Sequence, residues 1–69
     1  MTRYKIIIYW SEEDASFIAE VPELPGCMAD GATYRDALLN VEVIIQEWIE
    51  IASAEGRDIP TPKGRLMFA

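Results

Sequence analysis

A proline-rich corner followed directly by a capped helix most constrains how this chain folds. Residues 21–27 read VPELPGC, and Gly26 follows the second of the two prolines, Pro22 and Pro25. Proline fixes its own backbone angle and donates no backbone hydrogen bond, so this segment is a connection or an edge and not an interior strand. Apolar segments flank it on both sides. The corner therefore predicts a small α+β domain in which the chain reverses sharply before its helix.

Two strands are predicted before the corner and a shorter one after it. Residues 4–10 are rich in β-branched and aromatic side chains, and residues 15–21 continue this pattern beyond the polar, acidic turn at 11–14. A loop of about four residues suits an antiparallel hairpin. Residues 27–30 form the third predicted strand, which Gly31 ends.

The longest predicted element is an amphipathic helix over residues 34–54. Thr33 is a suitable N-cap, and the Asp36 carboxylate three residues later can reach back in the manner of a capping box. Gly56 is a suitable residue to end the helix. One stripe of the helix is apolar and should cover the sheet; it comprises Ala37, Val41, Ile44, Ile45, Trp48 and Ala52, with Leu38 and Ile49 at its margin. The predicted order is thus β-β-β-α, a three-stranded antiparallel sheet with one helix on it and an optional short final strand at 65–68.

The length of 69 residues predicts a single domain, 1–69, with no C-terminal DNA-binding domain. The hydrophobic core of a domain of this size gives only marginal stability, so such a domain needs further stabilisation by a disulfide, a metal or a second subunit. One cysteine and no histidine exclude an internal disulfide and the usual structural zinc site. We therefore expect a homo-oligomer. Leu39 and Val43, on the polar side of the helix, and Trp10 are the candidate contact residues, although singly exposed apolar residues are common.

A net charge of −6 bears on the partners of the chain. Phosphate neutralisation needs clustered Lys and Arg, so direct binding of nucleic acid is not expected. An acidic surface attracts basic partners instead, or simply keeps a small protein in solution. The apolar run at residues 6–10 is too short to cross a bilayer, and no signal peptide is recognisable, so a cytoplasmic protein is expected.

Catalytic chemistry finds little support in the sequence. Without histidine, neither a Ser–His nor a Cys–His nucleophile pair can be built, and Cys27 reads as a small apolar filler. The carboxylates are scattered over different elements, which does not suit a two-metal nuclease site. No phosphate-binding glycine loop or dinucleotide fingerprint is present. We expect no enzyme, no catalytic residues, no metal and no cofactor.

The amino-acid sequence of several segments resembles that of the N-terminal domain of the HicB-type antitoxin family. The resemblance covers residues 4–62 and is carried by the strand at 4–8, by residues 17–27 (FIAEVPELPGC), by Gly31-Ala32-Thr33, by Asp36-Ala37 and Asn40, by Ile45, Trp48 and Ile49, and by Gly56 with residues 59–62 (IPTP). It implies a truncated RNase H-like fold without the catalytic carboxylates of RNase H.

The resemblance also implies a partner, a small basic HicA-type RNase toxin whose active site the antitoxin covers. Full-length members usually carry a C-terminal DNA-binding module, and we expect none in this chain. On charge grounds the residues expected to bind the partner are Glu12, Glu13, Asp14, Glu20 and Glu23. The alternative is an orphan homo-oligomeric structural or scaffold protein without a toxin partner.

Overall fold

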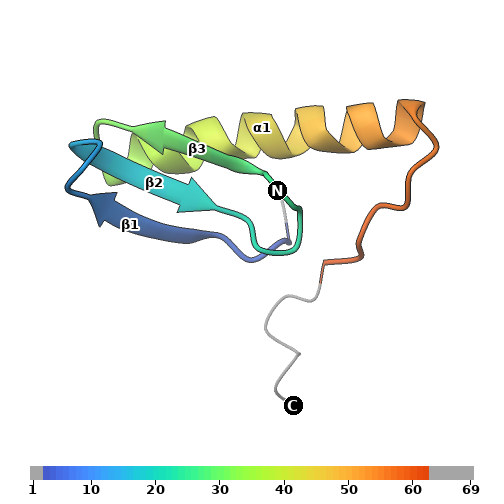
Figure 1. The fold of residues 1–69 in the computed structure, drawn as a ribbon, viewed down its shortest axis with the longest axis horizontal. Helices are drawn as coiled ribbons and strands as arrows, with labels where there is room; N and C mark the ends of the chain where they lie inside the picture. The colour runs from blue at the N-terminus through green and yellow to red at the C-terminus, as the bar shows by residue number, and fades with distance from the viewer. Residues whose placement is uncertain (1–2, 63–69) are drawn as a thin grey trace, which may run out of the picture.

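Three antiparallel strands and one long helix make up the fold, in a computed structural model that describes residues 3–62 (Figure 1). The strands are β1 (Ile7–Ser11), β2 (Ser16–Glu20) and β3 (Met28–Gly31), arranged in the order β1-β2-β3, and the helix is α1 (Tyr34–Ala54). The predicted α+β class, the three-stranded sheet and the helix bounds are confirmed. The predicted final strand at 65–68 lies outside the described residues.

The strands differ from the prediction at their ends, where contacts with distant residues or a turn replace the strand pairing. β1 begins at Ile7 and not at Tyr4. The residues before β1 form hydrogen bonds with distant parts of the chain. The Tyr4 hydroxyl donates to the carbonyl of Pro60, and the Lys5 backbone N–H donates to Glu23 Oε1 at 2.9 Å. β2 begins one residue late because Ala15 has a φ of +50° and completes the hairpin turn.

The corner between β2 and β3 consists of two consecutive turns. Leu24 N–H donates to the Val21 carbonyl at 3.0 Å, and Cys27 N–H donates to the Leu24 carbonyl at 2.9 Å. In the second turn Pro25 is followed by Gly26, whose φ of +79° is the conformation that a type II turn requires at this position. A third bond, from Val21 N–H to the Cys27 carbonyl at 3.0 Å, closes the neck of the corner. The side chains of Val21, Leu24 and Cys27 are buried, so the corner contributes to the core.

Both ends of α1 are capped as the sequence predicts. Thr33 Oγ1 accepts from Asp36 N–H at 3.0 Å, which confirms the N-cap, while no bond from the Asp36 carboxylate back to Thr33 is found among the described residues. At the other end Gly56 has a φ of +71°. Its N–H donates to Ser53 at 3.1 Å and that of Arg57 donates to Ala52 at 2.8 Å, a Schellman arrangement that satisfies the last carbonyls.

The helix packs most closely on β3, which is an outer strand of the sheet. Gly31 is the last residue of β3, paired with Phe17, and not the residue after the strand as predicted. A Cβ at this position would lie 2.7 Å from the Asp36 carbonyl carbon, so only glycine lets α1 start this close to the sheet. Asn40 Nδ2 donates to the Asp30 carbonyl at 2.8 Å, and Trp48 Nε1 donates to the Pro25 carbonyl at 3.0 Å. These two bonds fix α1 to β3 and to the corner.

Candidate protein-binding surface

One face of the sheet is left uncovered by the helix, and its side chains are both apolar and acidic. Side chains alternate between the two faces of a strand, and Tyr4, Ala19 and Val21 lie in the core under α1. The residues of the opposite face, here called the open face, are Ile7, Tyr9, Ile18, Glu20, Met28 and Asp30. Ile7, Tyr9 and Met28 are 40%, 42% and 48% exposed. Exposed apolar side chains that share one face mark a candidate interaction surface.

The register of the strands brings these residues together across the sheet. Ile18 on the central strand pairs with Tyr9 on one side and with Asp30 on the other. Ile18 is only 7% exposed, since its neighbours flank it. A hollow of about 430 Å³ opens between β2 and β3, lined by Asp14, Ser16, Ile18, Met28, Ala29 and Asp30. The hollow therefore has an apolar floor with carboxylates at its rim.

A hydrogen bond orders part of the open face. The Tyr9 hydroxyl donates to Glu20 Oε2 at 2.8 Å, diagonally across the β1–β2 pair. This bond is the main cause that raises the pKa of Tyr9 above its ordinary value, and desolvation and the charges of Glu20 and Asp14 add to it. The carboxylate of Glu20 is thus held in place on the surface, and one of its oxygens is engaged.

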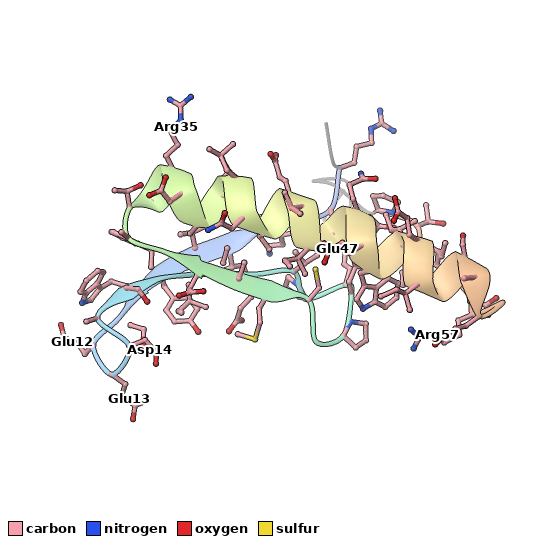
Figure 2. The ribbon with its side chains drawn as sticks, turned by 90° about the horizontal axis from the view of Figure 1, so that it is seen from above. Glu12, Glu13, Asp14, Arg35, Glu47 and Arg57 are labelled. Atoms are coloured by element: carbon pink, nitrogen blue, oxygen red, sulfur yellow. The ribbon has the colours of Figure 1, made fainter. Side chains whose placement is uncertain are left out.

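The structure separates the five acidic residues expected to bind a partner into three groups. Glu12 and Glu13 are exposed at the tip of the hairpin turn and point away from the sheet (Figure 2). Asp14 is held by Ser11, whose Oγ accepts from the Asp14 N–H at 3.2 Å, and it lines the hollow. Glu20 lies on the open face, at the other end of β2. Glu23 accepts a backbone N–H from Lys5 and lies in the corner. Glu20 therefore belongs to the open face and Asp14 to the rim of the hollow, whereas Glu12, Glu13 and Glu23 lie outside both.

The residues expected to contact another copy lie on two different surfaces. Leu39 and Val43 are exposed one helical turn apart on the outer side of α1. Trp10 is 46% exposed and lies at the sheet edge, where its ring meets Phe17 edge to face with centroids 5.1 Å apart. Phe17 in turn meets Tyr34 at 6.3 Å. The structure does not bring Trp10 together with the helix pair, and their role in an oligomer stays a prediction.

Neither a metal centre nor a reactive cysteine is formed by the described residues. No group of three or more His, Cys, Asp and Glu side chains within residues 3–62 is placed to hold a metal ion. Cys27 is 3% exposed, and burial raises the pKa of its thiol, which suppresses the reactive thiolate. Within the same residues no helix is both long and apolar enough to cross a membrane.

Sequence reasoning assigned a binding role to only one residue of the open face, Glu20, and it missed the other five, which are Ile7, Tyr9, Ile18, Met28 and Asp30. The only signal for them was the alternation within each short strand, and it becomes informative only once the register between strands is known. Asp30 pairs with Ile18, and Met28 pairs with Glu20, so each of these acidic residues lies beside an apolar residue of the neighbouring strand.

The fold defines a class, the small α+β domain with one sheet face covered by a helix and the other open. Within that class, residues 4–66 match the family model described as HicB_like antitoxin of bacterial toxin-antitoxin system. Two relatives cover most of the chain. UPF0150 protein Ta0767 of Thermoplasma acidophilum is 36% identical over 58 residues, which are 84% of this chain and 83% of the relative. UPF0150 protein ssl0259 of Synechocystis is 34% identical over 63 residues, 91% of this chain and 85% of the relative. No solved structure matches the chain.

The chain therefore belongs to the HicB-like antitoxin family of bacterial toxin–antitoxin systems. Membership confirms the resemblance inferred from the sequence and supports an antitoxin role.

Proposed function

We propose that this protein is a non-catalytic antitoxin that works in the cytoplasm, where it neutralises a HicA-type RNase toxin by covering the toxin's active site. The family supports a toxin partner in general. The observation that carries the proposal is the open face, which combines exposed Ile7, Tyr9 and Met28 with the carboxylates of Glu20 and Asp30.

The chemistry of this face suits a basic protein partner. An RNase binds a polyanion, so its substrate site is positively charged, and a carboxylate-bearing surface complements it. Apolar side chains supply burial once the two surfaces meet, while the charges mainly raise the association rate and select the partner. The turn residues Glu12 and Glu13 extend the acidic rim beyond the sheet.

The test measures binding and inhibition of a HicA-type toxin encoded beside this protein. The variant Asp14→Lys/Asp30→Lys reverses two charges at the rim of the hollow. We expect its affinity for the toxin to fall by at least about tenfold at low salt and the loss to shrink as salt is added. RNA cleavage by the toxin should return in parallel. Glu12→Lys/Glu13→Lys should weaken binding in the same direction.

A matched control separates the surface from overall charge. Glu47→Lys/Glu50→Lys changes the net charge equally but lies on α1, on the side away from the sheet. Toxin affinity should change little in this control. The open face would be removed from the proposal if Asp14→Lys/Asp30→Lys and this control lost affinity equally, or if neither lost any.

A second candidate function is an orphan homo-oligomeric structural or scaffold protein without a toxin partner. It is favoured by the exposed pair Leu39 and Val43 on the outer side of α1. Purification of the tagged protein from its native cells separates the two functions. A single small basic protein should be retained if the antitoxin proposal is right, and only further copies of this chain if the scaffold proposal is right.

A further inference from the structure

The hollow between β2 and β3 combines an apolar floor with two carboxylates. Ile18 forms the floor, and Met28 beside it is 48% exposed. Asp14 and Asp30 line the same space of about 430 Å³. Both are exposed, and within residues 3–62 neither carboxylate forms an ion pair. The hollow therefore offers a cation two acceptors of negative charge next to apolar surface.

The two carboxylates come from different elements, and each is positioned by its own local structure. Asp14 lies in the turn between β1 and β2, where its Oδ2 accepts from the Ser11 hydroxyl at 3.1 Å and its N–H donates to Ser11 Oγ at 3.2 Å. Asp30 is placed on β3 by its pairing with Ile18 of the central strand. Ser16 also lines the hollow, and its short side chain leaves the space open. The site is thus formed before a partner binds, which lowers the entropic cost of binding.

We propose that the hollow receives an arginine side chain of the basic protein partner, an inference that rests on the proposed function. A guanidinium is planar and carries five N–H donors, so it can bond to two carboxylates while its face lies on apolar atoms. It is also less strongly hydrated than an ammonium, so it enters a half-covered site at lower cost. Asp14 and Asp30 accept from its N–H groups, while Ile18 and Met28 contact its flat face and its methylene groups.

Other occupants suit the hollow less well. A metal ion such as Ca²⁺ takes about six to eight oxygen ligands. Within residues 3–62 no group of three or more His, Cys, Asp and Glu side chains is placed to hold a metal. A purely apolar segment would cover both carboxylates without supplying a counter-charge, which is costly. A free small molecule needs enclosure by its pocket, whereas this hollow opens onto the exposed face of the sheet. A side chain that projects from a larger partner is covered by the partner itself.

The first test needs no toxin, because it measures binding of the side chain alone. N-acetyl-arginine N-methylamide is titrated into the isotope-labelled full chain, the amide shifts are followed by NMR, and the lysine analogue is titrated in parallel. We expect saturable shifts confined to residues 14–18 and 28–30, and an affinity for the arginine analogue at least about twofold above that for the lysine analogue.

Charge-removing variants locate the site of this binding. Asp30→Asn should lower the affinity for the arginine analogue by about two- to fivefold, since it removes the charge of one partly exposed pair. Glu47→Gln is the matched control, because it removes the same charge from an exposed position on α1, apart from Asp14 and the turn (Figure 2). It should leave the affinity for the analogue unchanged.

The second test asks whether the hollow is occupied in the complex. Ser16→Tyr fills the hollow without changing the charge, and tyrosine suits a strand. We expect its affinity for the HicA-type toxin to fall on the order of tenfold. Ser53→Tyr adds the same side chain at an exposed position on α1 and should bind the toxin as the wild type does. Circular dichroism verifies that both variants keep the fold.

Three results would overturn the proposal. One is a set of shifts that extends equally to the carboxylates of α1, because the analogue would then bind acidic surface in general. Another is binding of the analogue only in Lys63→Gln/Arg65→Gln, since residues 63–69 of the same chain would then fill the hollow of the wild type. The last is toxin binding that is lost in Asp14→Lys/Asp30→Lys but is unchanged in Ser16→Tyr.

The two tests separate this inference from the proposed function. In the last result above, the open face still binds the toxin, so the proposed function stands while the arginine site does not. A wild-type chain that binds the arginine analogue with the expected preference but binds no toxin would overturn the proposed function and support the arginine site.

Discussion

The close approach of β3 to α1 makes Gly31→Ala the most informative stability variant. The new Cβ would lie 2.7 Å from the Asp36 carbonyl carbon and 2.8 Å from Asp36 Cβ, whereas ordinary contact begins at 3.4 Å. The first turn of the helix must therefore move away from the sheet. Overpacking of this kind costs about 1–3 kcal/mol. The same movement stretches the bond from Asn40 to the Asp30 carbonyl, now 2.8 Å, whose loss adds about 1 kcal/mol.

We expect Gly31→Ala to lower the free energy of unfolding by about 2–4 kcal/mol in all. For a domain of this size, this corresponds to a melting temperature lower by about 10 °C or more. Urea denaturation followed by circular dichroism measures the first quantity, and thermal melting measures the second. Gly56→Ala is the matched control, because its φ of +71° opposes alanine while no atom lies within 4 Å of the new Cβ. It should cost about 1 kcal/mol. A loss for Gly31→Ala no greater than that of Gly56→Ala would refute the close packing of helix and sheet.

Two further variants test single hydrogen bonds. Trp48→Phe keeps an aromatic ring but removes the donor to the Pro25 carbonyl, and it should lower the free energy of unfolding in urea by about 1 kcal/mol. An unchanged value would show that packing alone attaches the corner to α1. Glu20→Gln removes the charged acceptor of Tyr9, so the pKa of Tyr9 should fall toward its ordinary value in an absorbance titration corrected with Tyr9→Phe. Because folding raises the pKa of Tyr9, the stabilisation by the Tyr9–Glu20 bond is present below about pH 10 and is lost as the pH rises through the pKa of Tyr9 in the folded protein. The wild type should therefore lose stability at a higher pH than Glu20→Gln.

The helix was predictable to the residue because its ends are set by local chemistry. Thr33 caps its start and Gly56 ends it, and both act within one turn of their position in the sequence. The ends of the strands were less predictable since they depend on distant partners. Residues 4–6 look like a strand, yet Tyr4 and Lys5 bond to Pro60 and Glu23, and neither contact has a signal in the local sequence.

The candidate site was predictable only in its charge. Acidic character is a property of composition, and it indicated a basic partner and drew attention to Asp14 and Glu20. Which carboxylates share a surface depends on register, which places Asp30 beside Ile18 and leaves Glu12 and Glu13 at the tip of the turn. The exposure of Met28 depends likewise on which face the helix covers. The binding roles of these residues remain predictions until the charge-reversal variants are measured.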